Sequence, residues 1–193
     1  MIQETIVITQ NHVGQAHIAP MGIHVPKIGA EEIIILPFRP STTLNNLLDT
    51  KTAVINYCDD VRVFAGCLTG RRDWLMKKAE KITGFVLCSA LAHTEVELVR
   101  IENDIARPKL FCRTLHSVNH SPFNGFNRAQ YSVLEAAILV SRLKMLSVEK
   151  IKAELDYLRI GLEKTAGDKE MEAWGWLMVA IEEHFASTGV TCD

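Results

Sequence analysis

The hydrophobic pattern of this chain changes at residues 119–126, a connection rich in asparagine, proline and glycine. Before this connection, short runs of β-branched and apolar residues are separated by turn residues, which is typical of strands joined by tight loops. After it, apolar residues recur every three or four positions, as they do on one face of a helix. The sequence therefore predicts strands in the first 118 residues and helices in the remainder.

The predicted strands are short and closely spaced. Residues 4–25 indicate a hairpin, and further strands are expected at Glu31–Pro37, Thr52–Tyr57, Gly84–Val99 and Arg107–Val118. Within the third of these, Gly84–Val99, the alternation from Thr94 to Val99 is typical of a half-buried strand. Val61–Thr69 indicates a strand or a strand–helix junction, and Trp74–Lys78 indicates a brief helix. Six or seven strands with short connections favour a small β-barrel.

Three helices are expected after the barrel. The first spans Arg128–Met145, the second begins after an N-cap at Ser147, and the third begins near Asp168. The predicted fold class is therefore α+β with a mainly β core. We expect a barrel domain at residues 1–118 and a helical region at residues 119–193, packed on the barrel or on a partner subunit.

Composition excludes some classes of protein. A formal net charge of −2 argues against a broad nucleic-acid interface, and no stretch approaches the ~20 apolar residues of a membrane span. The first residues show neither the basic region nor the apolar run of a signal peptide. Five scattered cysteines suit free thiols in a reducing compartment better than a disulfide framework. We therefore expect a cytoplasmic location, with no nucleic acid or membrane as partner.

The segment Leu36–Leu47 is the strongest candidate for a binding site. It follows an apolar run and leads into a predicted short helix that begins near Thr42 or Thr43. Free N–H groups and the positive end of the dipole make a helix start suitable for an anion, and the guanidinium of Arg39 suits phosphate. The alternative is a capped surface turn with a solvent-facing arginine.

A second candidate lies in the return strand of the hairpin, where Ala19-Pro20-Met21-Gly22 is expected to interrupt the strand. Proline removes a donor from the ladder, and glycine often marks a bulge or a close approach of the backbone to another group. A ligand lying flat on the strand and a bulge that bends the sheet both account for the pattern.

Four segments resemble a family of uncharacterised flavin-reductase-like proteins that is found in methanogens and in methylotrophs using tetrahydromethanopterin. The segments are Thr5–Gly22 (TIVITQNHVGQAHIAPMG), Phe38–Leu47 (FRPSTTLNNL), Ala53–Asp60 (AVINYCDD) and Gly125–Ala129 (GFNRA). The resemblance implies an FMN-binding split β-barrel followed by a helical region. It also implies a homodimer with FMN at the subunit interface.

The resemblance also implies which residues meet the cofactor. The phosphate would be held at Arg39, Ser41, Thr42 and Thr43, and the isoalloxazine ring would lie beside Ala19, Pro20, Met21 and Gly22. Asn56 would reach the ring edge or the ribityl chain. Asn127 and Arg128 would contact the flavin or the partner subunit, or else would only cap the first long helix.

No side chain is identified as a catalytic acid or base, and no metal site is expected. The seven histidines show no set of three converging ligands, and one of them could donate to a flavin or substrate. Three functions stay open. The first is an FMN-dependent oxidoreductase acting on a one-carbon or pterin-related substrate. The second is an FMN-binding module without turnover that serves assembly or regulation. The third is an interaction protein that has lost the cofactor.

Overall fold

The computed structural model describes residues 1–26 and 32–187. Glu31, the first residue of a predicted strand, and residues 188–193 of the predicted helical region lie outside the described residues. The chain divides into two compact units, which are described separately below. One unit contains Met1–Cys58 and Trp74–Phe123, and the other contains Asp59–Asp73 and the residues from Asn124 onward.

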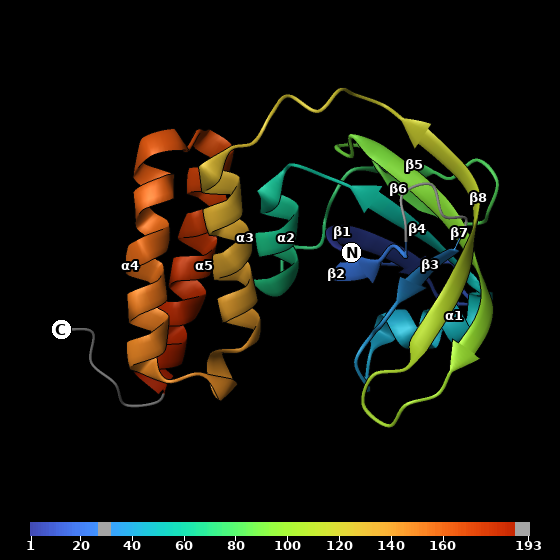
Figure 1. Ribbon diagram of the computed structural model, residues 1–193, viewed down its shortest axis with the longest axis horizontal. Helices are drawn as coiled ribbons and strands as arrows, with labels where there is room; N and C mark the ends of the chain where they lie inside the picture. The colour runs from blue at the N-terminus through green and yellow to red at the C-terminus, as the bar shows by residue number, and fades with distance from the viewer. Residues whose placement is uncertain (27–31, 188–193) are drawn as a thin grey trace. The chain divides into compact units, whose positions relative to one another are not determined.

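The first unit is a β-barrel (Figure 1). Six antiparallel strands close it in the order β1-β2-β3-β8-β7-β4 within the described part of the chain. Their bounds are β1 Ile2–Gln10, β2 Ala16–His24, β3 Glu32–Ile35, β4 Thr52–Tyr57, β7 Ala92–Glu102 and β8 Lys109–Asn119. The predicted fold class, a mainly β barrel followed by helices, is confirmed.

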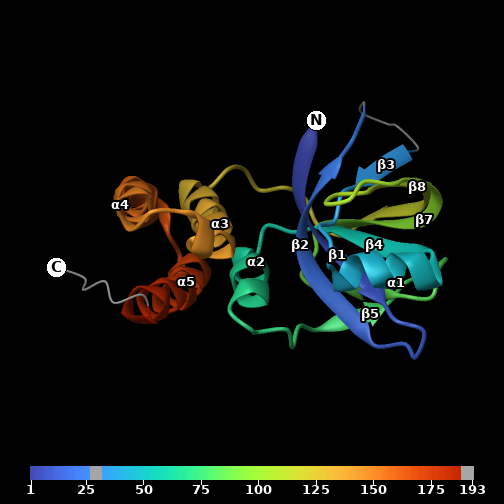
Figure 2. The ribbon, with the colours of Figure 1, turned by 90° about the horizontal axis from the view of Figure 1, so that it is seen from below.

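The barrel core is formed by alternate residues of each strand and by one helix. Val7, Ile55 and Val96 are fully buried among its members. Helix α1 (Thr42–Thr50) adds Leu44 and Leu47 to the same core, and Figure 2 shows this helix lying against the strands. Leucines three positions apart lie on the same side of a helix and give α1 one apolar face, which explains why it packs against the barrel core.

Strand β2 continues without interruption through Pro20 and Gly22. Each of its residues from Ala16 to His24 pairs one-to-one with β1, so the structure shows no bulge between these strands. On its other side, β2 pairs with β3 at only two positions, Ile23 and His24. Proline is tolerated in an edge strand where its missing N–H faces the open side. The prediction of an interrupted strand is therefore wrong.

A second, two-stranded sheet covers the outer face of the barrel. It consists of β5 (Met76–Lys78) and β6 (Phe85–Leu87), which pair antiparallel. The prediction of a brief helix at Trp74–Lys78 is therefore wrong. Backbone N–H groups of β6 and of the β5–β6 connection donate to the side chains of Asn56 and Glu95 on the barrel strands. These tertiary bonds explain why the segment is extended.

The second unit is made of helices packed around a common core. Figures 1 and 2 show them side by side and then end-on. Their bounds are α2 Val61–Leu68, α3 Arg128–Ser141, α4 Val148–Thr165 and α5 Asp168–Ser187, with a short 3-10 turn at Leu143–Met145. The predicted N-cap at Ser147 is confirmed, because its hydroxyl accepts a bond from the Lys150 N–H at 3.3 Å. The core includes Ala136, Ile151 and Leu177, all fully buried.

Helix α2 replaces the strand that was one interpretation of Val61–Thr69. Asp60 caps its N-terminus, with its carboxylate accepting a bond from the Arg62 N–H. Val61 and Ala65 lie four positions apart on one face of this helix and belong to the helical core. None of the described helices is both long enough and apolar enough to span a membrane.

Candidate functional site

The Arg39 loop, defined as residues Leu36–Thr43, leads from β3 into the N-terminus of α1. Ser41 is the N-cap, and its hydroxyl accepts a bond from the Leu44 N–H at 3.3 Å. Thr42 is exposed, whereas Thr43 is only 1% exposed. Within the described residues, the Thr42 and Thr43 N–H groups have no acceptor. The loop therefore presents two backbone donors at the positive end of a helix.

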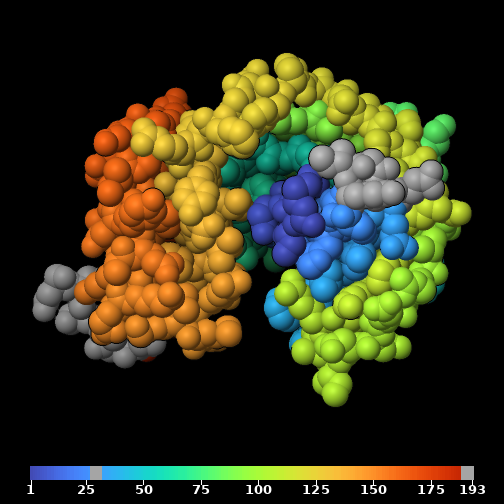
Figure 3. Space-filling view, in the orientation of Figure 1, coloured from blue at the N-terminus to red at the C-terminus, as the bar shows by residue number. Residues whose placement is uncertain are grey.

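The tip of the β7–β8 hairpin, residues 103–108, packs against the Arg39 loop. The Arg39 N–H donates to the Ala106 carbonyl at 2.9 Å, and the Arg107 Nε donates to the Leu36 carbonyl at 3.0 Å. The Arg107 guanidinium also lies 4.7 Å from the centre of the Phe38 ring. This tip projects at the lower edge of the barrel in Figure 3. The structure thus adds a second arginine that sequence reasoning missed, because nothing local to Arg107 indicates its partner.

The electrostatics of this tip favour an anion. Both Arg39 and Arg107 are exposed. Asp104 is the nearby counter-charge, and its carboxylate accepts from the Arg107 and Ala106 N–H groups at 2.7 and 2.9 Å. Those two bonds, followed by the charge of Arg39, hold the pKa of Asp104 below its ordinary value. Because Asp104 is occupied by its own backbone donors, two cations and a helix N-terminus remain for a phosphate group.

The second predicted segment, Ala19–Gly22, is half-buried and pairs only with β1 in the described structure. Pro20 is opposite Ile6, which is in turn opposite Asn56 on β4. Paired residues of antiparallel strands share a face of the sheet, so Pro20 and Asn56 belong to the same face, one strand apart. The structure therefore brings these two predicted positions into one row of the barrel.

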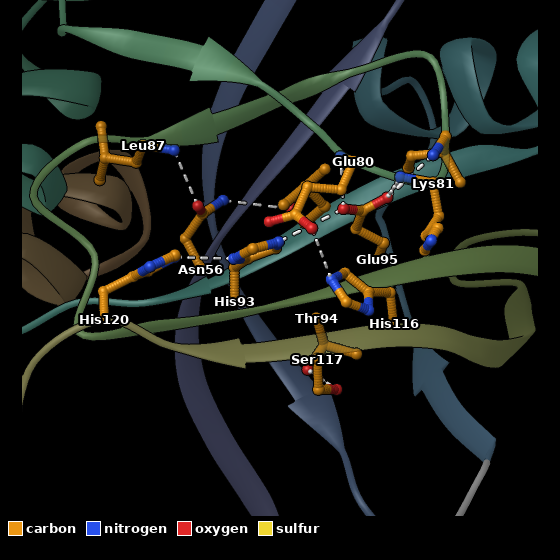
Figure 4. A network of polar contacts seen from close by, with 12 residues as sticks. Asn56, Glu80, Lys81, Leu87, His93, Thr94, Glu95, His116, Ser117 and His120 are labelled. Carbon is orange, nitrogen blue, oxygen red and sulfur yellow. Dashed lines mark hydrogen bonds and ion pairs between the residues drawn. The ribbon is translucent and has the colours of Figure 1, made fainter.

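Asn56 itself is fully buried, and its amide is used within the barrel. Its Nδ2 donates to the Ile6 carbonyl at 3.2 Å, and its Oδ1 accepts from the Leu87 N–H at 2.9 Å. This side chain attaches the β5–β6 sheet to the barrel (Figure 4). The structure shows a stabilising role for Asn56.

Asn127 and Arg128 belong to the helical unit. Asn127 caps α3, since its Oδ1 accepts from the Ala129 N–H at 2.8 Å while its Nδ2 donates to the Thr165 carbonyl at 3.1 Å. Arg128 is exposed beside Tyr131 and Tyr157, with which it lines a small cavity of about 110 Å³. The structure gives Asn127 a capping role.

A buried polar network on the barrel was not predicted. It consists of Glu95 and His93 on β7 and of His120 just after β8, and is called the Glu95 network below (Figure 4). Glu95 is fully buried and accepts from the N–H groups of Glu80, Lys81 and Ile82 at 2.7, 2.8 and 2.8 Å. The prediction of a half-buried strand fails at this residue because the β5–β6 connection covers the outer face of β7.

The Glu95 network continues through two imidazoles. His93 Nε2 lies 3.4 Å from a Glu95 oxygen, and His93 Nδ1 lies 2.8 Å from His120 Nε2. The two rings are stacked with their centres 5.0 Å apart. The signal available in the sequence was a pair of polar residues two positions apart in an apolar strand, which places both on one face.

Burial alone would raise the pKa of Glu95. The three backbone donors, followed by His93, outweigh burial and hold this pKa below its ordinary value, so the carboxylate is ionised at neutral pH. Partial burial lowers the pKa of His120, and the nearby charge of Lys77 lowers it further. Among the described residues, no three His, Cys, Asp or Glu side chains converge as ligands for a metal ion.

The six-stranded antiparallel barrel is similar in fold to solved FMN-binding and flavin reductase proteins. The chain belongs to the DUF447 family of proteins of unknown function. The profile of the family's N-terminal domain matches residues 3–121, and a second DUF447 profile matches residues 127–179. The family resemblance predicted from the sequence is therefore confirmed.

Solved structures with this fold include three informative cases. An FMN-bound DUF447 protein of Methanosarcina mazei has 22% identity and a TM-score of 0.79, over 93% of this chain and 94% of that one. The 2-nitrobenzoate 2-nitroreductase of Pseudomonas fluorescens has 16% identity and a TM-score of 0.53, and the match covers 61% of this chain and 64% of that one. An FMN-binding protein of Thermus thermophilus has 11% identity and a TM-score of 0.52, and the match covers 60% of this chain and 69% of that one. Among curated proteins, none matches this chain.

Proposed function

We propose that this protein is an FMN-binding flavoprotein whose barrel domain, residues 1–118, holds the cofactor. The observation that carries the proposal is the Arg39 loop, where two exposed arginines and two unused backbone donors meet at a helix N-terminus. A phosphate dianion fits that donor set. The FMN-bound relative from Methanosarcina mazei, which covers 93% of this chain, supports the same cofactor.

Most of the predicted cofactor residues have a proposed part in this site. Arg39 and Thr42, with the Thr43 N–H, would bind the phosphate, while Ser41 fixes the start of α1. The half-buried stretch Ala19–Gly22 would lie beside the ring, because its backbone has a strand on one side only. The FMN would supply the redox chemistry, and the protein would orient it and set its electrostatic surroundings.

We further propose an oxidoreductase role in the cytoplasm, linked to one-carbon or pterin-related metabolism, with a homodimer that places FMN between subunits. The family resemblance supports this assignment, and the open side of β2 suits a ligand shared with a second subunit. Asn127, Arg128 and the helical region at residues 119–193 would then pack on the barrel or on the partner. Stopped-flow reduction by NADH or NADPH tests the redox role, and failure with a broad panel of donors and acceptors would contradict it.

The absorbance of the natively purified protein tests cofactor binding directly. We expect the spectrum of oxidised flavin either at once or after FMN is added and the protein is desalted. A protein that remains colourless after this treatment would contradict the proposal and would make the Arg39 loop an ordinary capped turn.

Replacing Arg39 with alanine is expected to weaken FMN binding by about 1.5–3 kcal/mol, the range for hydrogen bonds to charged groups. This corresponds to a roughly 10- to 150-fold higher Kd. Fluorescence titration with FMN measures the change. Riboflavin, which lacks the phosphate, should bind the variant and the wild type equally.

The matched control for this variant is Arg113→Ala, which removes an exposed arginine of β8 that pairs with Glu97 at 2.8 Å. It should leave FMN affinity unchanged. Equal losses for FMN and riboflavin in the Arg39 variant, or no loss for either, would remove the phosphate role from Arg39.

A further inference from the structure

The Glu95 network connects a buried carboxylate to a cavity on the surface of the barrel unit. Glu95 and His93 are 0% and 1% exposed, whereas His120 is exposed. His120 lines an open cavity of about 830 Å³ together with Tyr57, Leu91 and Phe123. Burying a charge and an imidazole is costly unless each is bonded, so the network is a defined arrangement of donors and acceptors.

The ionised Glu95 fixes the direction of the hydrogen bonds. A carboxylate only accepts, so His93 must donate from Nε2, and in a neutral ring Nδ1 is then an acceptor. His93 Nδ1 therefore accepts from His120 Nε2–H, at 2.8 Å. A neutral His120 that donates from Nε2 carries its free lone pair on Nδ1. The network thus sets the tautomer of an exposed imidazole that lines a cavity.

The charged groups around His120 keep it in the basic form. Its pKa is lowered first by partial burial and then by the positive charge of Lys77 on β5, while Glu80 opposes this shift. Glu80 is itself bonded to His116 of β8, at 3.2 Å. At neutral pH His120 is therefore unprotonated and able to accept a proton.

The cavity lies far from the Arg39 loop along the barrel. His93 and His120 are at the open end of the β7–β8 hairpin, whereas Arg39 contacts Ala106 at its tip. At ~3.3 Å per residue, the eleven residues of β7 separate the two ends by roughly 30 Å. The His120 cavity is therefore distinct from the proposed phosphate site.

We propose that His120 is a general base for a small planar weak acid, such as a phenol, that binds in this cavity. Tyr57 and Phe123 provide aromatic walls for a planar ring. The ligand O–H bond breaks, its proton forms a new N–H bond at His120 Nδ1, and the ligand remains as the anion. The positive charge on His120 is stabilised through His93 by the Glu95 carboxylate. His93 and Glu95 are positioning residues, since neither touches the ligand.

The probe for this proposal is 4-nitrophenol, whose ionised form is visible by difference absorbance. At a pH just below the pKa of the free phenol, the wild-type protein should raise the ionised fraction of bound probe. His120→Asn should lower the ratio of ionised to neutral bound probe about tenfold, the effect of one pKa unit. His12→Asn is the matched control, because His12 is an exposed histidine in the β1–β2 turn. Circular dichroism checks that both variants are folded.

Nitrogen-15 NMR of histidine-labelled wild-type protein gives an independent result. We expect both His93 and His120 to carry their proton on Nε2, and His120 Nδ1 to become protonated when 4-nitrophenol is added. His93→Gln should retain probe binding but move the pH midpoint of ionisation upward by about one unit. A purely structural network would not produce that shift.

Several results would overturn the proposal. These are equal probe ionisation by His120→Asn and the wild type, no change at His120 Nδ1 when the probe is added, or a His93→Gln profile identical to that of the wild type. None of these measurements depends on flavin. Their failure therefore leaves the proposed FMN site standing, and a colourless protein leaves the His120 base standing.

Discussion

Replacing Glu95 with alanine is expected to lower the free energy of unfolding by about 3–5 kcal/mol, because each donor left without an acceptor costs about 1–3 kcal/mol. The change would leave the N–H groups of Glu80, Lys81 and Ile82 without their acceptor, in a segment bonded at 2.7–2.8 Å. It would also remove the partner of His93. Urea denaturation followed by circular dichroism measures this loss.

The matched control is Glu97→Ala, two residues along the same strand. Glu97 is half-buried and pairs with the exposed Arg113, so its loss should cost no more than about 1 kcal/mol. If Glu95→Ala and Glu97→Ala cost the same, then the three backbone bonds do not stabilise the barrel as the structure indicates.

The same carboxylate gives stability a dependence on pH. Folding depresses the pKa of Glu95, so its contribution is fully present above the unfolded value of about 4.3 and is lost as the pH falls through the lower folded value. The wild type should therefore lose stability on acidification below about pH 4–5. Glu95→Gln, which carries no titrating group, should show a flatter dependence in that range. Parallel curves would contradict the assignment of this acid-sensitive contribution to Glu95.

Replacing Leu177 with alanine is expected to cost about 2–5 kcal/mol, because it removes a fully buried side chain from the helical core. Each compact unit has its own core, so we expect the loss to be local. Hydrogen exchange followed by mass spectrometry should show faster exchange in α3, α4 and α5 but not in the barrel strands. Met171→Ala, on the exposed side of the same helix, should change little.

Helix α2 is the informative element in that experiment. Its residues precede residue 118, yet Val61 and Ala65 belong to the helical core. Faster exchange in α2 together with α3–α5 would assign residues 59–73 to the helical domain. Unchanged exchange in α2 would instead support domains divided at residues 118 and 119. Equal acceleration in the barrel strands would contradict independent units altogether.

Local signals were enough to predict much of the fold. The predicted strands at Thr5–Gln10, Gly84–Val99 and Arg107–Val118 overlap the observed strands β1, β7 and β8. Ser147 carries the signature of an N-cap and serves as one. These features are determined within a few residues of the chain, where hydrophobic period and capping chemistry act.

The failures have a common cause, which is that distant segments decide the outcome. Trp74–Lys78 resembles a short helix by itself, but tertiary bonds to the barrel extend β5. The alternation at Thr94–Val99 predicted a half-buried strand, but Glu95 is fully buried because it accepts from backbone N–H groups, which leave no trace in residue identity. In the candidate site, Arg39 and Ser41 were predictable from their local pattern, whereas Arg107 and His120 depend on the pairing of β7 with β8.

Among the described residues, Ala19–Gly22 of β2 pair with a strand on one side only, which has a consequence for assembly. An edge strand with free N–H and C=O groups is a template on which another chain can add, and such growth has no natural end. Pro20, in the middle of β2, supplies no N–H, so a further strand could not form an unbroken ladder there. The edge is thus closed to strand-by-strand polymerisation while remaining accessible to a flat ligand. We therefore expect Pro20, which was predicted to interrupt the strand, to hinder aggregation through this edge.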